Sequence, residues 1–189
     1  MTDALLAARV VAFAAPAALS TTQDVVRIVR PALGAGADAG VVAEETLSLV
    51  ATLTARAAET GLRTRPDALA TAGPALAEVP FLYHDYLLGA QMVAEGAEGT
   101  VTPDASVYER LDRKAAFYNV HLPPGRFPGP SVLAEKLPLW MGRVSPPRLP
   151  TNPQERLGTL GIADLLAVHT RLVLAFAQKA AADGAPDPA

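Results

Sequence analysis

Residues 162–176, IADLLAVHTRLVLAF, carry the clearest structural signal in the chain. Their large apolar side chains recur three or four residues apart, which is the spacing of one face of an α-helix. Asn152 followed by Pro153 predicts an N-cap and a first helical residue ahead of this face. His169 falls on the apolar stripe, so we interpret it first as a neutral core histidine.

Helical signals of the same kind recur toward the N-terminus. We expect one helix from Asp3 to about residue 15, ended by Pro16, and a second from Ser20 or Thr21 to about Gly34. A third is expected over 40–60, with Gly61 as a left-handed terminator.

Three further helices are expected before the final one. A shorter helix begins at Pro66 and is interrupted at Gly73 and Pro74. Residues 80–95 are apolar nearly all round, which is typical of a central helix. Thr102 followed by Pro103 predicts the start of a helix that runs to about His121.

No stretch shows convincing strand alternation, and aromatic residues make up only 5% of the chain. The sequence therefore predicts an all-α fold, a single helical bundle of about six to seven helices over residues 1–183. Residues 184–189, with two prolines in six positions, are expected to form a disordered tail.

Composition excludes several classes of protein. The 189 residues include no cysteine and carry a formal net charge of -3. Disulfides and thiolate metal sites are therefore excluded, and nothing gives the basic balance that a general nucleic-acid binder needs. The apolar run over 4–19 follows an acidic residue, contains Arg9 and stops at Pro16, which favours a packed helix over a secretory signal or a membrane span. We expect a cytoplasmic protein that contacts neither membrane nor nucleic acid.

A proline-rich segment over 123–153 precedes the final helix. It holds nine of the 17 prolines and the single tryptophan, and we expect at most one short helix in it, around 131–141. Residues 1–109 have a charge balance of -7, whereas residues 110–156 have +5. Long irregular connections of this kind are often functional.

Two interpretations of this segment stay open. It is either a docking surface for a partner or a second copy of the chain, or a belt over the protein's own acidic helices that buries the tryptophan. Arginine, tryptophan and methionine are enriched at protein interfaces. The candidate contact residues are Arg126, Phe127, Trp140, Met141, Arg143 and Arg148.

No metal or cofactor site is predicted. Metal ligands on one helix lie three or four residues apart, and no carboxylate or second histidine stands at those distances from any of the three histidines. The glycine–alanine stretch 34–40 does not match a dinucleotide-binding motif and is interpreted as a connector.

Tyrosines and histidines form the densest polar cluster in an apolar context. If the helices that carry them are antiparallel neighbours, these side chains frame a polar pocket that suits a small ligand or proton transfer. The alternative is a buried network that fixes helix register. The candidate residues are Tyr83, His84, Tyr86, Tyr118, His121 and His169.

Two hypotheses about function follow. The first is a non-catalytic assembly protein, a homo-oligomer or a binder of a protein partner, that acts through segment 123–153. The second is a ligand-binding protein or enzyme that uses the tyrosine and histidine pocket. The sequence favours the first.

Overall fold

The computed structural model describes residues 1–34, 36–85, 105–145 and 157–183, and every regular element among them is a helix. The prediction of an all-α fold is thus confirmed for this part of the chain. Six helices have the following bounds: α1 Asp3–Leu33, α2 Ala39–Gly61, α3 Pro66–Ala77, α5 Ala105–His121, α6 Pro130–Val144 and α8 Ile162–Asp183.

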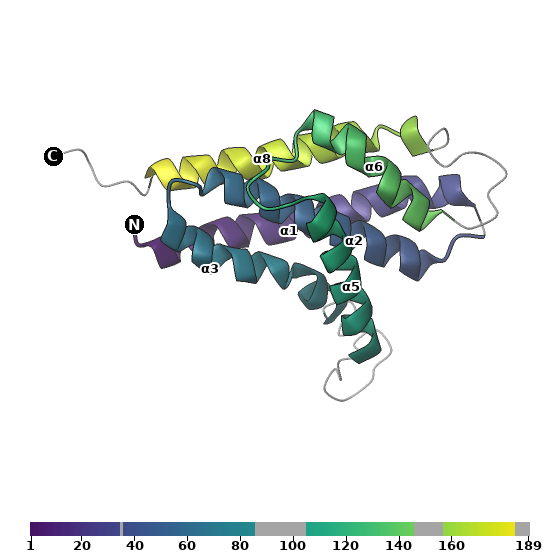
Figure 1. Ribbon diagram of the computed structural model, residues 1–189, viewed down its shortest axis with the longest axis horizontal. Coiled ribbons are helices and arrows are strands. Elements are labelled where there is room, and N and C mark those ends of the chain that lie inside the picture. The colour runs from purple at the N-terminus through teal and green to yellow at the C-terminus, as the bar shows by residue number, and fades with distance from the viewer. Residues whose placement is uncertain (35, 86–104, 146–156, 184–189) are drawn as a thin grey trace.

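Helix α2 is the centre of the fold. It packs against α1, α3, α5, α6 and α8. Helices α1, α2 and α8 run lengthwise beside one another, and α5 crosses them steeply (Figure 1). The helix is buried along most of its length, including the run from Glu45 to Thr54. From Glu45 to Thr54, every side chain of α2 is therefore buried, whichever way it points.

Helix α1 is continuous where two helices were expected. The predicted break at Pro16 is wrong, and so is the interruption of α3 at Gly73 and Pro74. Proline removes one hydrogen bond to the carbonyl four residues earlier. Pro16, Pro31 and Pro74 are all exposed, and so are the residues four positions before them. Water can therefore reach the carbonyls that lose their hydrogen bonds.

Thr21, at which a second helix was expected to begin, and its neighbour Thr22 have other roles inside α1. Thr22 donates its hydroxyl to the carbonyl of Ala18 at 2.8 Å, which is the usual bond of a threonine inside a helix. Thr21 turns inward to His169. Thr2, by contrast, caps the observed N-terminus by accepting from the amide of Leu5.

The predicted helices over 40–60 and up to His121 are confirmed by α2 and α5. The role given to Gly61 is wrong, because it has no positive φ. A Cβ added there would lie 2.5 Å from the Cβ of Ala177 and 3.0 Å from the carbonyl oxygen of Leu174. Gly61 therefore lets α8 pack closely against the end of α2.

Within the described part of the proline-rich segment, the short helix expected around 131–141 is present as α6. Its bounds, Pro130–Val144, make it four residues longer than expected. Pro130 stands at its first position after Gly129, where a missing amide costs nothing. The segment's remainder over 146–153, the second half of the helix expected over 80–95, the caps at Thr102 and Asn152, and the tail lie outside the described residues.

Helix α1 is long and apolar enough to cross a membrane by length and composition alone. A core helix passes the same test, and one stripe of α1 is fully buried against its neighbours in the bundle: Leu6, Val10, Ala14, Ala18, Val25 and Val29.

Candidate functional site

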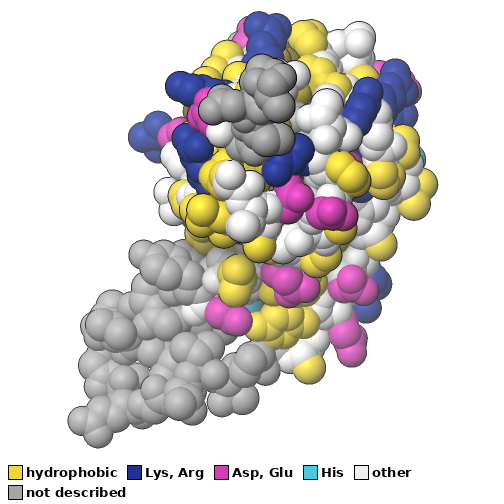
Figure 2. Space-filling model, turned by 90° about the vertical axis from the view of Figure 1, so that its left-hand side faces the viewer, with side chains coloured by type: hydrophobic (Ala, Val, Ile, Leu, Met, Phe, Trp, Pro, Cys, Tyr) yellow, Lys and Arg dark blue, Asp and Glu magenta, His cyan; other side chains and the backbone are white. Residues whose placement is uncertain are grey.

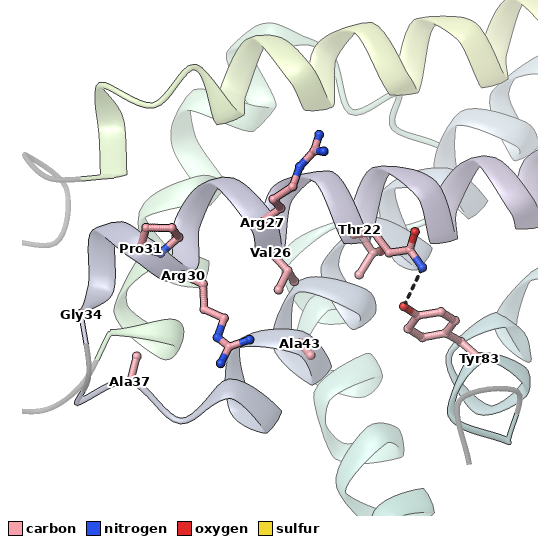
Figure 3. A pocket seen from close by; sticks show the side chains of 10 residues that line it. Thr22, Val26, Arg27, Arg30, Pro31, Gly34, Ala37, Ala43 and Tyr83 are labelled. Atoms are coloured by element: carbon pink, nitrogen blue, oxygen red, sulfur yellow. Dashed lines mark hydrogen bonds between the residues drawn. The ribbon is translucent and has the colours of Figure 1, made fainter. Parts of the chain in front are cut away.

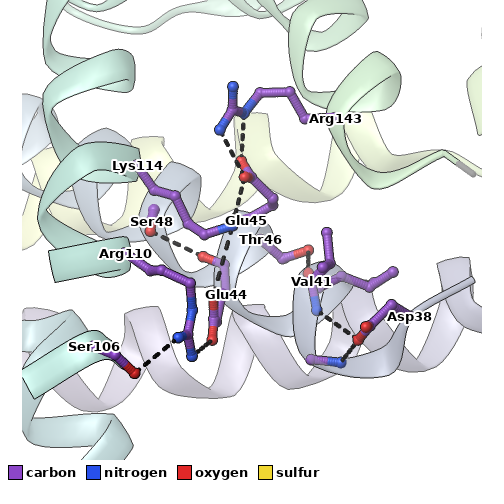
Figure 4. Close-up of polar contacts among 12 residues, drawn as sticks. Asp38, Val41, Glu44, Glu45, Thr46, Ser48, Ser106, Arg110, Lys114 and Arg143 are labelled. Carbon is purple, nitrogen blue, oxygen red and sulfur yellow. Dashed lines mark hydrogen bonds and ion pairs between the residues drawn. The ribbon is translucent and has the colours of Figure 1, made fainter. Parts of the chain in front are cut away.

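A buried carboxylate on α2 joins three helices. Glu45 is 2% exposed and accepts hydrogen bonds from Lys114 on α5 and from Arg143 on α6 (Figure 4). The distances are 2.7 Å from Lys114 Nζ, 2.7 Å from Arg143 Nε and 2.8 Å from Arg143 Nη2. The hydroxyl of Tyr118 donates to Oε2 of Glu45 at 2.9 Å, and the guanidinium of Arg143 also lies over the ring of Phe117.

The cluster keeps its charges. Burial alone would raise the pKa of Glu45, but the hydrogen bonds from Arg143, Lys114 and Tyr118 outweigh it and lower the pKa. The bond to Glu45 raises the pKa of Arg143, and burial beside this carboxylate raises the pKa of Tyr118. Both carboxylate oxygens already accept from two donors, so the carboxylate is occupied as a structural tie and not presented to a substrate.

A second buried cluster lies where α1, α2 and α8 meet. His169 is 4% exposed; its Nδ1 lies 3.0 Å from the hydroxyl of Thr21, and its Nε2 lies 2.7 Å from the hydroxyl of Thr54. Thr54 donates its single proton to the carbonyl of Val50 at 2.7 Å. Nε2 must therefore carry the imidazole proton, and Nδ1 accepts from Thr21.

Burial lowers the pKa of His169 to about 4, so the ring is neutral at pH 7. Both ring nitrogens are satisfied, as the interpretation of a neutral core histidine requires. The partners are two threonine hydroxyls. Thr21 and Thr54 come from helices far apart in sequence, which is why the pattern around His169 could not identify them.

The other predicted pocket residues have separate partners. Tyr83 accepts from the amide of Gln23 at 3.3 Å, His84 packs edge-on to the ring of Tyr108, and His121 packs against Phe117. Tyr118 belongs to the Glu45 cluster, and Tyr86 lies outside the described residues. The polar contacts therefore do not unite these residues in one site.

The residues predicted to contact a partner fall into three groups. Trp140 and Met141 are 0% and 7% exposed and belong to the core, while Arg143 pairs with Glu45. Arg126 is exposed and Phe127 is half-buried. Arg148 lies outside the described residues. The α6 part of the segment thus packs on its own chain, which is the belt interpretation, and the docking role stays a prediction for the exposed part.

A cavity lies between the last three turns of α1, the start of α2 and Tyr83. Its volume is about 690 Å³, which is within the usual range of small-molecule sites. Val26, Pro31, Ala37 and Ala43 contribute apolar walls. The side chain of Arg30 points toward Ala43 and Ala37, whereas that of Arg27 points away (Figure 3).

Sequence reasoning did not single out Glu45 or Arg30. Glu45 stands three residues after Val42 and four before Leu49, inside the apolar stripe of its helix. A carboxylate in that register is a signal that could have found it, since buried charges require partners. Arg30 carries no comparable signal, because its cavity is built by residues from three separate segments.

Within the described ranges, no group of three or more histidine, aspartate or glutamate side chains could hold a metal ion. No protein-family model matches the chain, and neither a curated protein nor a solved structure does. The cavity and the two clusters are therefore the features from which a function can be argued.

Proposed function

We propose that this chain is a non-catalytic helical protein that binds a small molecule in the cavity between α1, α2 and Tyr83. The observation that carries the proposal is the cavity itself, which combines apolar walls with an arginine and a tyrosine hydroxyl. Sites for small ligands are mostly apolar with a few placed polar groups.

The engagement of Glu45, Lys114, His169 and Arg56 supports a role without catalysis, although Nε2 of His84 and Oε2 of Glu59 are buried without a hydrogen-bond partner among the described residues. Glu45 and Lys114 are bound to each other, and His169 is bound to two threonines. Buried Arg56 donates to the carbonyl of Leu122 at 2.7 Å and to the side chains of Glu59 and Asn119. A general acid or base needs a free position for the substrate proton, and these groups are engaged in holding helices together.

The proposal is tested with N-phenyl-1-naphthylamine, an uncharged dye that fluoresces in apolar sites. We expect saturable binding at one site, and we expect Ala43→Phe to weaken it because the ring fills the cavity. Ala175→Phe is the matched control, since it adds the same side chain to an exposed position on α8. Equal binding by both variants, or no saturable binding by the unmodified chain, would overturn the proposal.

A second candidate function is contact with a protein partner or a second copy through the exposed part of segment 123–153. Arg126 is exposed there, and Val120, just ahead of the segment, is 76% exposed. Exposed apolar and arginine side chains favour interfaces. If the chain self-associates through this surface, Val120→Ser combined with Arg126→Glu will lower its sedimentation coefficient to that of a monomer; an unchanged coefficient excludes the surface.

The remaining expectations accompany this proposal: a single domain over 1–183, a cytoplasmic location, no cofactor, and no nucleic-acid or membrane partner. On the face drawn in Figure 2, basic side chains share the surface with acidic ones. Such mixing is unlike the one-signed surface that phosphate backbones require.

A further inference from the structure

The charge inside the cavity indicates which class of molecule it takes. Arg30 forms no hydrogen bond or ion pair with any other residue that the structure describes, and its side chain extends along the cavity (Figure 3). Arg27, three residues earlier, pairs with Asp24 at 2.9 Å and points away. One cationic group is therefore available to a ligand.

Arg30 is an exposed residue, and the basic side chains that tie the helices together differ from it in being paired. Arg56, Lys114 and Arg143 each meet a carboxylate of the chain at hydrogen-bonding distance. A guanidinium beside apolar walls is best matched by a carboxylate, which accepts two parallel N–H bonds. Among the residues that the structure describes, no acidic side chain lines this cavity. A bound anion would thus supply a charge that the protein does not.

The apolar walls of the cavity indicate which kind of group carries the anion. Val26 and Ala43 offer methyl groups between Arg30 and Tyr83, and Pro31 and Ala37 add apolar groups on the other side of Arg30 (Figure 3). At the Tyr83 end, Gln23 donates to the tyrosine oxygen at 3.3 Å, which leaves the tyrosine O–H free to donate. The cavity thus runs from a cation through an apolar stretch to a hydroxyl.

We propose that the ligand is a singly charged amphipathic carboxylate, a short-chain or medium-chain carboxylic acid whose head group binds Arg30. This inference rests on the proposed ligand-binding function. One guanidinium balances one negative charge, so a monocarboxylate fits better than a nucleotide or another polyanion, which would need several cations.

Octanoate and 1-octanol test this assignment because they share an apolar chain and differ in the head group. Each is titrated against the bound dye N-phenyl-1-naphthylamine. We expect octanoate to displace the dye at lower concentration than octanol does. Arg30→Gln should weaken octanoate about five- to tenfold, which is the effect of losing one charge-assisted pair, and should leave octanol unchanged.

Arg27→Gln is the matched control, because it removes the same charge from the same helix. It should change octanoate binding less than twofold. Arg30→Lys keeps the charge without the two parallel donors and should fall between the unmodified chain and Arg30→Gln. Far-ultraviolet circular dichroism checks that each variant is folded. If Arg30→Gln does not fold, Arg30→Lys serves as the test instead.

The outcomes separate this inference from the proposed function. If octanol competes as well as octanoate, or if Arg27→Gln and Arg30→Gln weaken octanoate equally, the cavity binds apolar molecules without recognising an anion and the inference fails alone. If the dye shows no saturable binding, both fail.

Discussion

The two buried polar clusters that include residues of α2 differ in the charge of the group at their centre. Glu45 stays charged and requires donors from α5 and α6, whereas His169 stays neutral and requires only two hydroxyl groups from α1 and α2. A buried charge is costly unless it is paired and hydrogen-bonded, while a buried neutral group needs only hydrogen bonds. The side of α2 toward α5 and α6 is thus held by ion pairs, and the side toward α1 and α8 by close packing and hydroxyls.

Glu45→Gln gives the largest expected effect, because it leaves Lys114 and Arg143 without their shared partner. Removing one member of a buried ion pair typically costs 3–5 kcal/mol, so we expect the free energy of unfolding in urea to fall by about 3 kcal/mol or more. Glu109→Gln is the control; this exposed residue pairs with Arg113 at 3.8 Å, outside the cluster, and should cost less than about 1 kcal/mol. An equal loss of unfolding free energy in the two variants would show that the Glu45 cluster contributes no more than an ordinary ion pair.

Acid should affect the two clusters in different pH ranges. The unfolded chain protonates His169 near pH 6.5 and the folded chain near pH 4, so stability falls by about 3 kcal/mol as the pH drops between these values. The lowered pKa of Glu45 stabilises the fold above pH 4.5, and that contribution is lost below it.

The test is the free energy of unfolding as a function of pH. Compared with the unmodified chain, His169→Gln should flatten the curve between pH 6.5 and 4. A curve for His169→Gln that keeps its slope would place the acid sensitivity elsewhere in the chain.

The smallest effect is expected at the close contact between α2 and α8. Gly61→Ala puts a methyl group 2.5 Å from Ala177 Cβ and should destabilise the fold by about 1–2 kcal/mol, although alanine is the better helix former. Gly142→Ala in α6 has open space and should stabilise by about 0.5–1 kcal/mol. Thermal unfolding of both variants shows whether each substitution raises or lowers the stability of the fold. A stabilising Gly61→Ala would mean that α2 and α8 can move apart without cost.

Much of the fold could be predicted because helical period and capping are local. The bounds expected for α2 differ from the observed ones by one residue at each end, and α5 ends at His121 as expected. The break expected at Pro16 failed because tolerance of an internal proline depends on which way the helix faces. That orientation is set by α2 and α8 and cannot be read from α1 alone.

The candidate sites were less accessible to sequence reasoning. That His169 is buried followed from its place on the stripe, but Thr21 and Thr54 lie 148 and 115 residues away from it. The tyrosines and histidines were grouped by chemical type and spacing, whereas long-range packing gave each its own partner. The cavity at Arg30 depends on three segments meeting in space.

The central place of α2 also bears on how the molecule opens. A helix that contacts every other described helix cannot be exposed by releasing any one of them. Amide protons of α2 should therefore exchange with solvent only through global unfolding, while those of α3, which touches just α1 and α2 among the stronger contacts, exchange through smaller openings. Hydrogen exchange would then show one slow core helix with faster helices around it.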